Sequence, residues 1–334
     1  MAKTSSPLFD GLRTPLGRGT VLMPGTCGEL VQGTLEGVPF HVSCPIDLFA
    51  RVSVEIHPFD ELLRQAQDAV RASPSQREWP GVSGPDDCPK AQAAVRACLA
   101  SLGLPRTGIR GKLQITSSLP RGKGMASSTA DVAGAILATA EALGREIDTQ
   151  EVARLAVAVE PTDGSLFPGI ALFAHRGGSL YQDLGPPLPL SILALDCGGE
   201  VDTLAFNAVD RRPLLRRLEP QTTAALEMVR QGLALRDIVL LGEGATLSAV
   251  ANQEVLYKPQ LEAVMKLSRE IGALGVNVGH SGTIIGVLLA PDAALADAEA
   301  YLKKKLPGLG RVYRCHLIGG GPLEGGPSKK CGLT

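Results

Sequence analysis

The stretch that decides the fold runs from Ser117 to Gly144 and reads SSLPRGKGMASSTADVAGAILATAEALG. A short strand is predicted just before it, at Leu113–Ile115, and a glycine-containing turn then leads into Ser127 and Ser128. The alanine-rich segment that follows predicts a helix that ends at Gly144. A strand, a glycine turn and a helix in this order indicate a site where a phosphate group binds at a helix N-terminus.

Each part of this turn has a physical reason to attract phosphate. Gly122 and Gly124 have no Cβ, so the backbone can turn tightly and approach an anion. The first N–H groups of the helix lack partners within the helix and lie at the positive end of its dipole. Arg121 and Lys123 add positive charge, and the serine hydroxyls can bind phosphate or Mg²⁺. The alternative is an ordinary helix start with Ser127 as the N-cap, since neither a Walker A sequence nor G-x-G-x-x-G occurs here.

The composition narrows the class of protein. The chain has 334 residues, 44% of them hydrophobic, and a formal net charge of −1 without a long basic run. Two modest domains with a sizeable core are expected, and no nucleic-acid partner. The start has no apolar signal segment and the longest apolar stretch, Thr283–Ala290, is too short to span a bilayer, so a cytoplasmic protein without a membrane partner is expected.

The cysteine and histidine residues show no metal-binding pattern. The seven cysteines include no C-x-x-C pair, which predicts reduced thiols. The five histidines are scattered along the chain, so no zinc site is expected.

The expected elements alternate between strands and helices. Strands are predicted at 19–23, 40–44, 48–56, 113–115, 170–174, 179–181, 191–196, 284–289 and 311–317. Helices are predicted at 60–72, 91–102, after Asp148, and at about 213–231, 234–249 and 292–304. The segment PGTCGELVQG at 24–33 is expected to be a turn-rich loop. The proline-rich segment after Leu184 marks the predicted domain boundary, giving domains 1–185 and 190–317 and a disordered tail at 318–334.

Two acids stand where the helix after Asp148 must stop, in Glu160-Pro-Thr-Asp163-Gly. Paired carboxylates in such a place can bind a metal ion and act on a hydroxyl group. The alternative is structural, because Asp-Gly after a helix is a common turn.

Three loops together resemble the motifs of the GHMP small-molecule kinases. They are PGTCGELVQG at 24–33, P-x-x-x-G-M-A-S-S-T at 120–129, and GVNVGHSGT at 275–283. The middle motif departs from the family's usual P-x-x-x-G-L-G-S-S-A at Met125, Ala126 and Thr129. The resemblance implies an α+β fold, with a ribosomal-protein-like N-terminal domain that contains a left-handed βαβ crossover, and a ferredoxin-like C-terminal domain.

Within that family, six blocks are similar to the L-threonine kinases of cobalamin biosynthesis. The blocks are CGELVQG at 27–33, SCPIDLF at 43–49, GKGMASSTAD at 122–131, EPTDG at 160–164, GGEVDTLAFN at 198–207 and NQxxLxKP at 252–259. This resemblance implies transfer of a phosphate from ATP to the side-chain hydroxyl of L-threonine, for the aminopropanol linker of cobalamin. ATP and L-threonine are the expected partners, and a homodimer is left open.

The resemblance also assigns roles to residues. Ser128 and Glu160 would bind Mg²⁺, and Asp163 would act on the acceptor hydroxyl as the catalytic residue. An ordinary Asp has a pKa of about 3.9, so a late proton transfer is expected from Asp163. The ATP phosphates would be held by the middle loop, at Pro120, Gly122, Lys123, Gly124, Met125, Ala126, Ser127 and Ser128.

An amino-acid substrate needs partners of both charges. Glu29 and Asp202 are candidates for the ammonium group, and Lys258, His280 or the backbone around Ser281 and Gly282 for the carboxylate. Two other functions stay open: another GHMP kinase, such as a homoserine kinase, and a non-catalytic nucleotide-binding or RNA-binding protein on the same fold.

Overall fold

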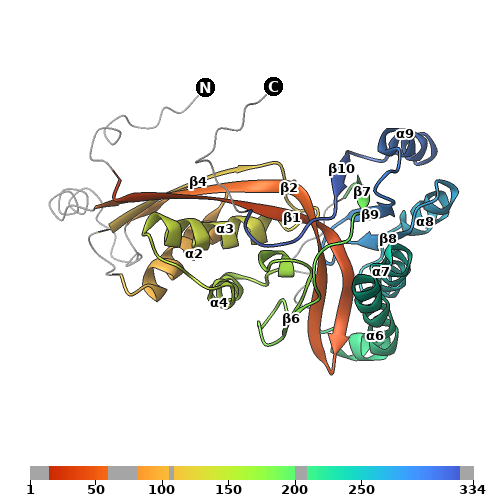
Figure 1. Ribbon diagram of the computed structural model, residues 1–334, viewed down its shortest axis with the longest axis horizontal. Helices are drawn as coiled ribbons and strands as arrows, with labels where there is room; N and C mark the ends of the chain where they lie inside the picture. Colours follow the sequence, from red (N-terminus) through yellow and green to blue (C-terminus); the bar gives the residue numbers. More distant parts are fainter. Residues whose placement is uncertain (1–14, 59–80, 105–108, 200–208, 324–334) are drawn as a thin grey trace.

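A long antiparallel hairpin forms the axis of the molecule. The computed structural model describes residues 15–58, 81–104, 109–199 and 209–323. In Figure 1, β1 (Gly17–Leu35) and β2 (Val38–Pro58) run side by side through both halves of the elongated molecule. Ten strands of the described residues form one mixed sheet around this hairpin, with the main order β10-β7-β9-β8-β1-β2-β4-β3.

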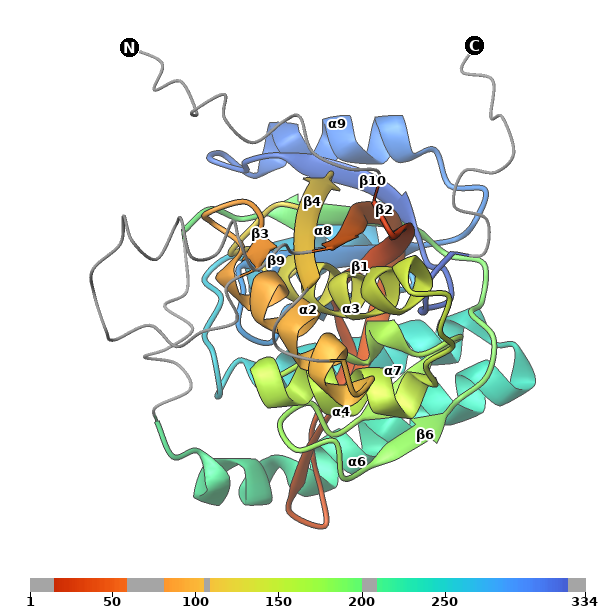
Figure 2. The ribbon, with the colours of Figure 1, turned by 90° about the vertical axis from the view of Figure 1, so that its left-hand side faces the viewer.

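The first half of the sheet is covered by helices on one face. β2 pairs with β4 (Ile109–Ser117), and β4 pairs in parallel with β3 (Val82–Ser83). Figure 2 shows α3 (Ser127–Ala142) flanked by α2 (Pro89–Ser101) and α4 (Thr149–Val159). The small side chains of α3 let it lie close to the hairpin, because a Cβ on Gly134 would come within 2.7 Å of the Val52 side chain.

A short irregular region links the two halves. A 3₁₀ turn at Gly164–Leu166 leads to β5 (Ala171–Phe173), which pairs with both β2 and β6 (Tyr181–Asp183). The β5 pairing sets Phe173 opposite His41, so the chain after α4 is fixed against the middle of the hairpin.

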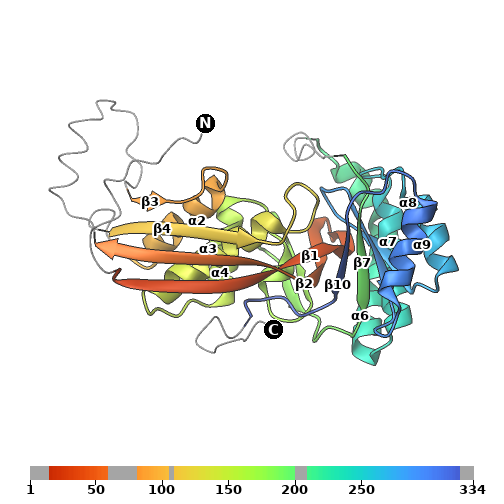
Figure 3. The same cartoon turned by 90° about the horizontal axis from the view of Figure 1, so that it is seen from above.

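The second half extends the same sheet. β7 (Ser191–Asp196), β8 (Gly275–Val278), β9 (Ile284–Leu289) and β10 (Val312–His316) are antiparallel, and β8 joins β1 at Glu29 opposite Val278. Figure 3 shows their helices gathered at the far end of the molecule. These helices are α6 (Arg212–Leu235), α7 (Ile238–Asn252), α8 (Leu261–Glu270) and α9 (Leu295–Lys305).

The helices lie on one face or at one end of a largely antiparallel sheet, and this arrangement confirms the α+β class. One sheet passes through both predicted domains, so the boundary at 185–190 stays a prediction. No helix in the described ranges is both long and apolar enough to cross a bilayer.

Three segments differ from the predictions or lie outside the described residues. The predicted turn-rich loop at 24–33 is part of β1, because bulges after Pro24 and Thr26 absorb the residues that break strands. Part of the predicted disordered tail, 318–323, is placed against the first half, where Leu323 N–H donates to Leu22 O (3.0 Å) and Gly321 N–H to Ser165 O (2.8 Å). The predicted helix at 60–72 and tail residues 324–334 lie outside the described residues.

Candidate active site

The three motif loops meet at the junction of the two halves. Thr26 N–H donates to Met125 O (3.1 Å), and Ile284 N–H donates to Lys123 O (3.1 Å). Gly124 lies against Gly282, so closely that a Cβ on Gly282 would stand 2.3 Å from Gly124 N. The middle loop is therefore held by backbone contacts to both other loops.

The helix after this loop starts differently from the expected serine cap. Ser127 is the first residue of α3, and the N-cap is Ala126, whose φ of 55° lies in the left-handed region. No side chain caps the first N–H groups of α3. The interpretation of Ser127 as a capping residue is thus wrong, and the helix N-terminus keeps donors for a ligand.

A cavity of about 340 Å³ opens in front of this helix start. Gly122, Ser127 and Ser128 line it, together with Lys90 and Arg121. Arg121 pairs with Asp87 (2.6 Å), and burial raises the pKa of Asp131, at the back of the cavity, to about 6. Two cations, two hydroxyls and a helix N-terminus form a suitable environment for a phosphate chain.

Lys123 does not face this cavity. Its ammonium lies 3.2 Å from Asp196 Oδ1 and donates to Gly199 O at 3.0 Å, at the end of β7. Pro120 precedes the turn, and the buried Met125 contributes its carbonyl to the contact with Thr26. These residues shape the loop, whereas Lys90 is among the residues that line the cavity.

Ser128 and Glu160, predicted to share a metal ion, are brought together. The Ser128 hydroxyl donates to Glu160, whose other carboxylate oxygen lies 2.5 Å from Lys90 Nζ. A carboxylate and a hydroxyl at the edge of the phosphate cavity are hard oxygen donors of the kind that Mg²⁺ prefers. The donor set fits that ion.

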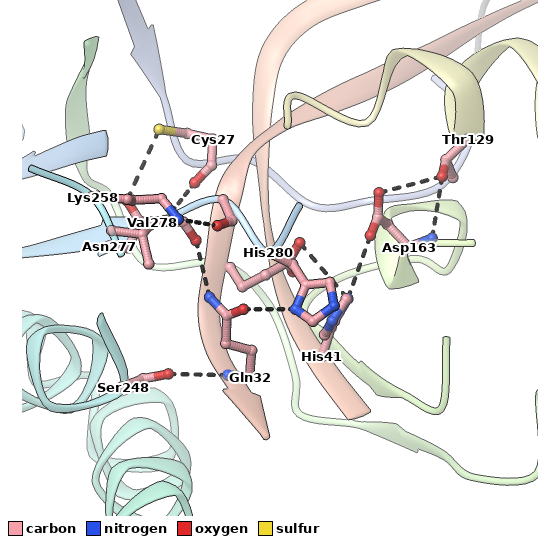
Figure 4. A network of polar contacts seen from close by, with 12 residues as sticks. Cys27, Gln32, His41, Thr129, Asp163, Ser248, Lys258, Asn277, Val278 and His280 are labelled. Atoms are coloured by element: carbon pink, nitrogen blue, oxygen red, sulfur yellow. Dashed lines mark hydrogen bonds and ion pairs between the residues drawn. The ribbon is translucent and has the colours of Figure 1, made fainter. Parts of the chain in front are cut away.

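Asp163 lies next to this pair and is held from the helix side. Thr129 Oγ1 donates to Asp163 Oδ2 (3.3 Å) and accepts from Asp163 N–H (3.1 Å). The Asp163 side chain is 24% exposed, so it can reach a ligand. Its Oδ1 lies 3.5 Å from His41 Nδ1. Figure 4 shows Asp163 between Thr129 and His41.

Three histidines that are scattered in the sequence gather beyond Asp163. The rings of His41 and His175 stack with centroids 3.7 Å apart, and the His280 ring lies 4.4 Å from that of His41. His280 Nδ1 lies 2.9 Å from Gln32 Oε1, as seen in Figure 4. Burial holds the pKa values of His175 and His280 well below the usual range, so these two rings are neutral. Three histidines that are scattered along the sequence thus lie together in the fold.

The predicted substrate residues divide into two groups. Glu29 is 4% exposed and faces His41, and His280 lies in the histidine group. Lys258 is buried and donates to Gly279 O (2.9 Å), so it supports the loop that contains Ser281 and Gly282. Asp202 lies outside the described residues.

Comparisons with known proteins identify the family of the chain. The model of the GHMP kinase N-terminal domain matches residues 90–171, and that of the GHMP kinase C-terminal domain matches 229–308. The fold and these family-model matches define a small-molecule kinase, and the chain belongs to the GHMP kinase family.

Among curated relatives, the chain is similar to two L-threonine kinases. It is 33% identical to that of Salmonella typhimurium over 80% of this chain and 81% of that protein. It is 32% identical to that of Citrobacter freundii over 80% of this chain and 84% of that protein.

Solved structures show the same fold. A homoserine kinase from Cytophaga hutchinsonii has a TM-score of 0.65 at 16% identity and covers 93% of this chain and 98% of its own. The L. major mevalonate kinase in complex with R-mevalonate has a TM-score of 0.63 at 18% identity, with 95% and 100% covered.

Sequence reasoning missed Lys90, His41 and His175 as site residues. Lys90 lies at the start of α2, and only the packing of α2 on α3 brings it to Glu160. His41 and His175 come from β2 and from the chain after β5, and the pairing of these two strands brings the rings together.

Proposed function

We propose that this protein is an ATP-dependent L-threonine kinase that forms O-phospho-L-threonine and ADP, for the aminopropanol linker of cobalamin. The observation that carries the proposal is the 33% identity over 80% of the chain to an L-threonine kinase. The partly exposed Asp163 carboxylate, which is held by Thr129 next to Ser128, supports it. Homoserine kinase is the second candidate, since one structural neighbour carries that name.

The phosphate chain of ATP would lie in the cavity before α3. The N-terminal N–H groups of α3, the hydroxyls of Ser127 and Ser128, and the cations of Lys90 and Arg121 would neutralise it. Ser128 and Glu160 would hold Mg²⁺, which supplies charge neutralisation at the phosphates when bound.

The acceptor hydroxyl would approach from the side of Asp163. Thr129 fixes one carboxylate oxygen, so Asp163 orients the hydroxyl toward the phosphate cavity and takes its proton late in the transfer. This proton does not need a strong base, because the hydroxyl becomes acidic only as its oxygen bonds to phosphorus.

The test is ADP release with Mg·ATP and a panel of L-threonine, L-serine, L-homoserine and mevalonate. L-Threonine is expected to have the highest kcat/KM. A clear preference for L-homoserine or mevalonate would assign the protein to another activity of the family. ATP binding without turnover of any alcohol would favour a non-catalytic protein.

A further inference from the structure

We propose that Glu29 and Asp163 together bind a vicinal amino alcohol, Glu29 taking the ammonium and Asp163 the neighbouring hydroxyl. The substrate class is thus a 1,2-amino alcohol, such as L-threonine. This inference rests on the proposed kinase function and assigns a substrate-binding role to Glu29.

The two carboxylates come from different elements and converge on one ring nitrogen. Glu29 lies on β1, His41 on β2, and Asp163 at the turn after α4. His41 Nδ1 lies 3.8 Å from Glu29 Oε1 and 3.5 Å from Asp163 Oδ1. One oxygen of each acid and one nitrogen of His41 lie within 4.8 Å of one another.

Glu29 has the features of an acid that awaits a cation. Its side chain is 4% exposed, and its Oε2 has no hydrogen-bond partner among the described residues. A buried carboxylate oxygen without a partner is unfavourable, and an ammonium group with three N–H donors removes that penalty. The neutral rings of His175 and His280 add no positive charge that would repel an ammonium.

The distance between the two carboxylates suits a ligand whose two hydrogen-bond donors are on neighbouring carbon atoms. Each donor would lie about 2.8 Å from its carboxylate oxygen. Oxygens no more than 4.8 Å apart can therefore be bridged by an ammonium and a hydroxyl on adjacent carbon atoms.

The experiment compares substrates and variants in steady-state kinetics with saturating Mg·ATP. The substrates are L-threonine, 1-amino-2-propanol, L-homoserine and 3-hydroxybutyrate, which has the hydroxyl and carboxylate of threonine but no amine. The variants are Glu29→Gln and a matched control, Glu55→Gln, which removes the same charge from β2 where Glu55 pairs with Arg18. Thermal melts and ATP titration of each variant check that the fold and the nucleotide site persist.

The inference predicts that Glu29→Gln impairs the substrates that carry an amine more than the one that lacks it. Glu29→Gln should raise the KM for L-threonine and 1-amino-2-propanol by about tenfold or more, because it removes a hydrogen bond to a charged group. Its effect on kcat, and on the turnover of 3-hydroxybutyrate, should stay within about threefold. Glu55→Gln should change neither.

Two results would overturn the inference while leaving the kinase function intact. One is an unchanged KM for L-threonine in Glu29→Gln. The other is an equal loss for L-threonine and 3-hydroxybutyrate, which would mean that Glu29 only supports the site. Failure of the proposed function is distinct, because the wild-type enzyme would then turn over L-homoserine or mevalonate in preference to L-threonine.

Discussion

At the scale of single residues, Asp163 is the group on which turnover depends most. Its carboxylate is oriented by Thr129 and lies near His41, and its side chain is 24% exposed and therefore open to a ligand. Glu160, three residues earlier, is already engaged by Ser128 and Lys90. The two acids therefore have different environments, and their variants should differ in kind.

Asp163→Asn keeps the size of the side chain and removes the proton acceptor. We expect kcat to fall by about 10²–10⁴, the usual contribution of acid–base catalysis, with ATP affinity little changed. Glu160→Gln should instead raise the Mg²⁺ concentration needed for half-maximal rate, because an amide is a weaker ligand for a hard cation. A Mg²⁺ titration of both variants checks this, and rescue of Asp163→Asn alone by extra Mg²⁺ would reverse the two roles.

Glu29 gives a prediction about stability and pH. Burial raises the pKa of Glu29 to about 7 from an ordinary 4.5, and His41 only partly offsets this. Cys27 on the same strand, Cys44 on β2, and Asp163 also face it. Because the folded state binds this proton more tightly than the unfolded state, the stabilisation by Glu29 is full below about pH 4.5 and is lost as the pH rises through about 7.

The variant Glu29→Gln should therefore melt at a higher temperature than the wild type at pH 8. At pH 5, where the wild-type carboxyl is protonated and similar in shape to an amide, the two should melt alike. Thermal melts at the two pH values check this, with Glu55→Gln as the control. A difference of equal size at both pH values would contradict the raised pKa.

At the scale of elements, the contact between the middle and third loops positions the phosphate site. A Cβ on Gly282 would lie 2.3 Å from both Gly124 N and Lys123 O, which are backbone atoms of the other loop. Gly282→Ala must therefore displace the turn that leads into α3.

We expect Gly282→Ala to lower kcat/KM for ATP by about 10²-fold, the effect of a misplacement of about 1 Å in a site that works by positioning. Gly177→Ala is the matched control, because nothing lies within 4 Å of a Cβ at Gly177. ATP titration and steady-state kinetics measure both. Similar losses in the two variants would show that the loop contact is unimportant.

The helix and loop elements were largely predictable because their signals are local. The alanine-rich α3 and the cap of α4, where Asp148 accepts from Glu151 N–H at 2.8 Å, follow from a few adjacent residues. The course of β1 was not predictable from local residues, since PGTCGELVQG has the composition of a turn and becomes strand only by pairing with β2 and β8.

Some residues of the candidate site could likewise be predicted from the sequence, and others could not. Ser128, Glu160 and Asp163 lie in short motifs that can be read from adjacent residues. The structure brings Ser128 to Glu160, and Thr129 to Asp163. The histidine group has no sequence pattern, because His41, His175 and His280 come from separate elements that only the sheet unites. The left-handed conformation of Ala126 was also hidden, since the serine that follows resembles an N-cap.

At the scale of the whole molecule, the hairpin makes each half depend on the other. The part of the hairpin nearest its turn contributes fully buried side chains to a core shared with α6, α7 and β9. These side chains include Leu30, Val31, Phe40 and Val42. Residues of both predicted domains therefore contribute to this core, as they do to the single sheet.

A fragment of residues 1–185 is expected not to fold alone. Exposing four such side chains costs about 6–12 kcal/mol, at about 1.5–3 kcal/mol each, which is as large as the stability of a typical domain. Circular dichroism and thermal melts of the fragment test this, with the fragment mixed with residues 186–334 as the control. A cooperative melt of residues 1–185 alone would show that the halves are independent.

The contact of Ile318–Leu323 with the first half has a consequence for synthesis on the ribosome. Leu323, which donates to the Leu22 carbonyl, lies 301 residues further along the chain than Leu22. At about 5–20 residues per second, the two are separated by about 15–60 s of translation. Until then this contact is missing, so the nascent chain is incompletely assembled and stays open to chaperones and to aggregation.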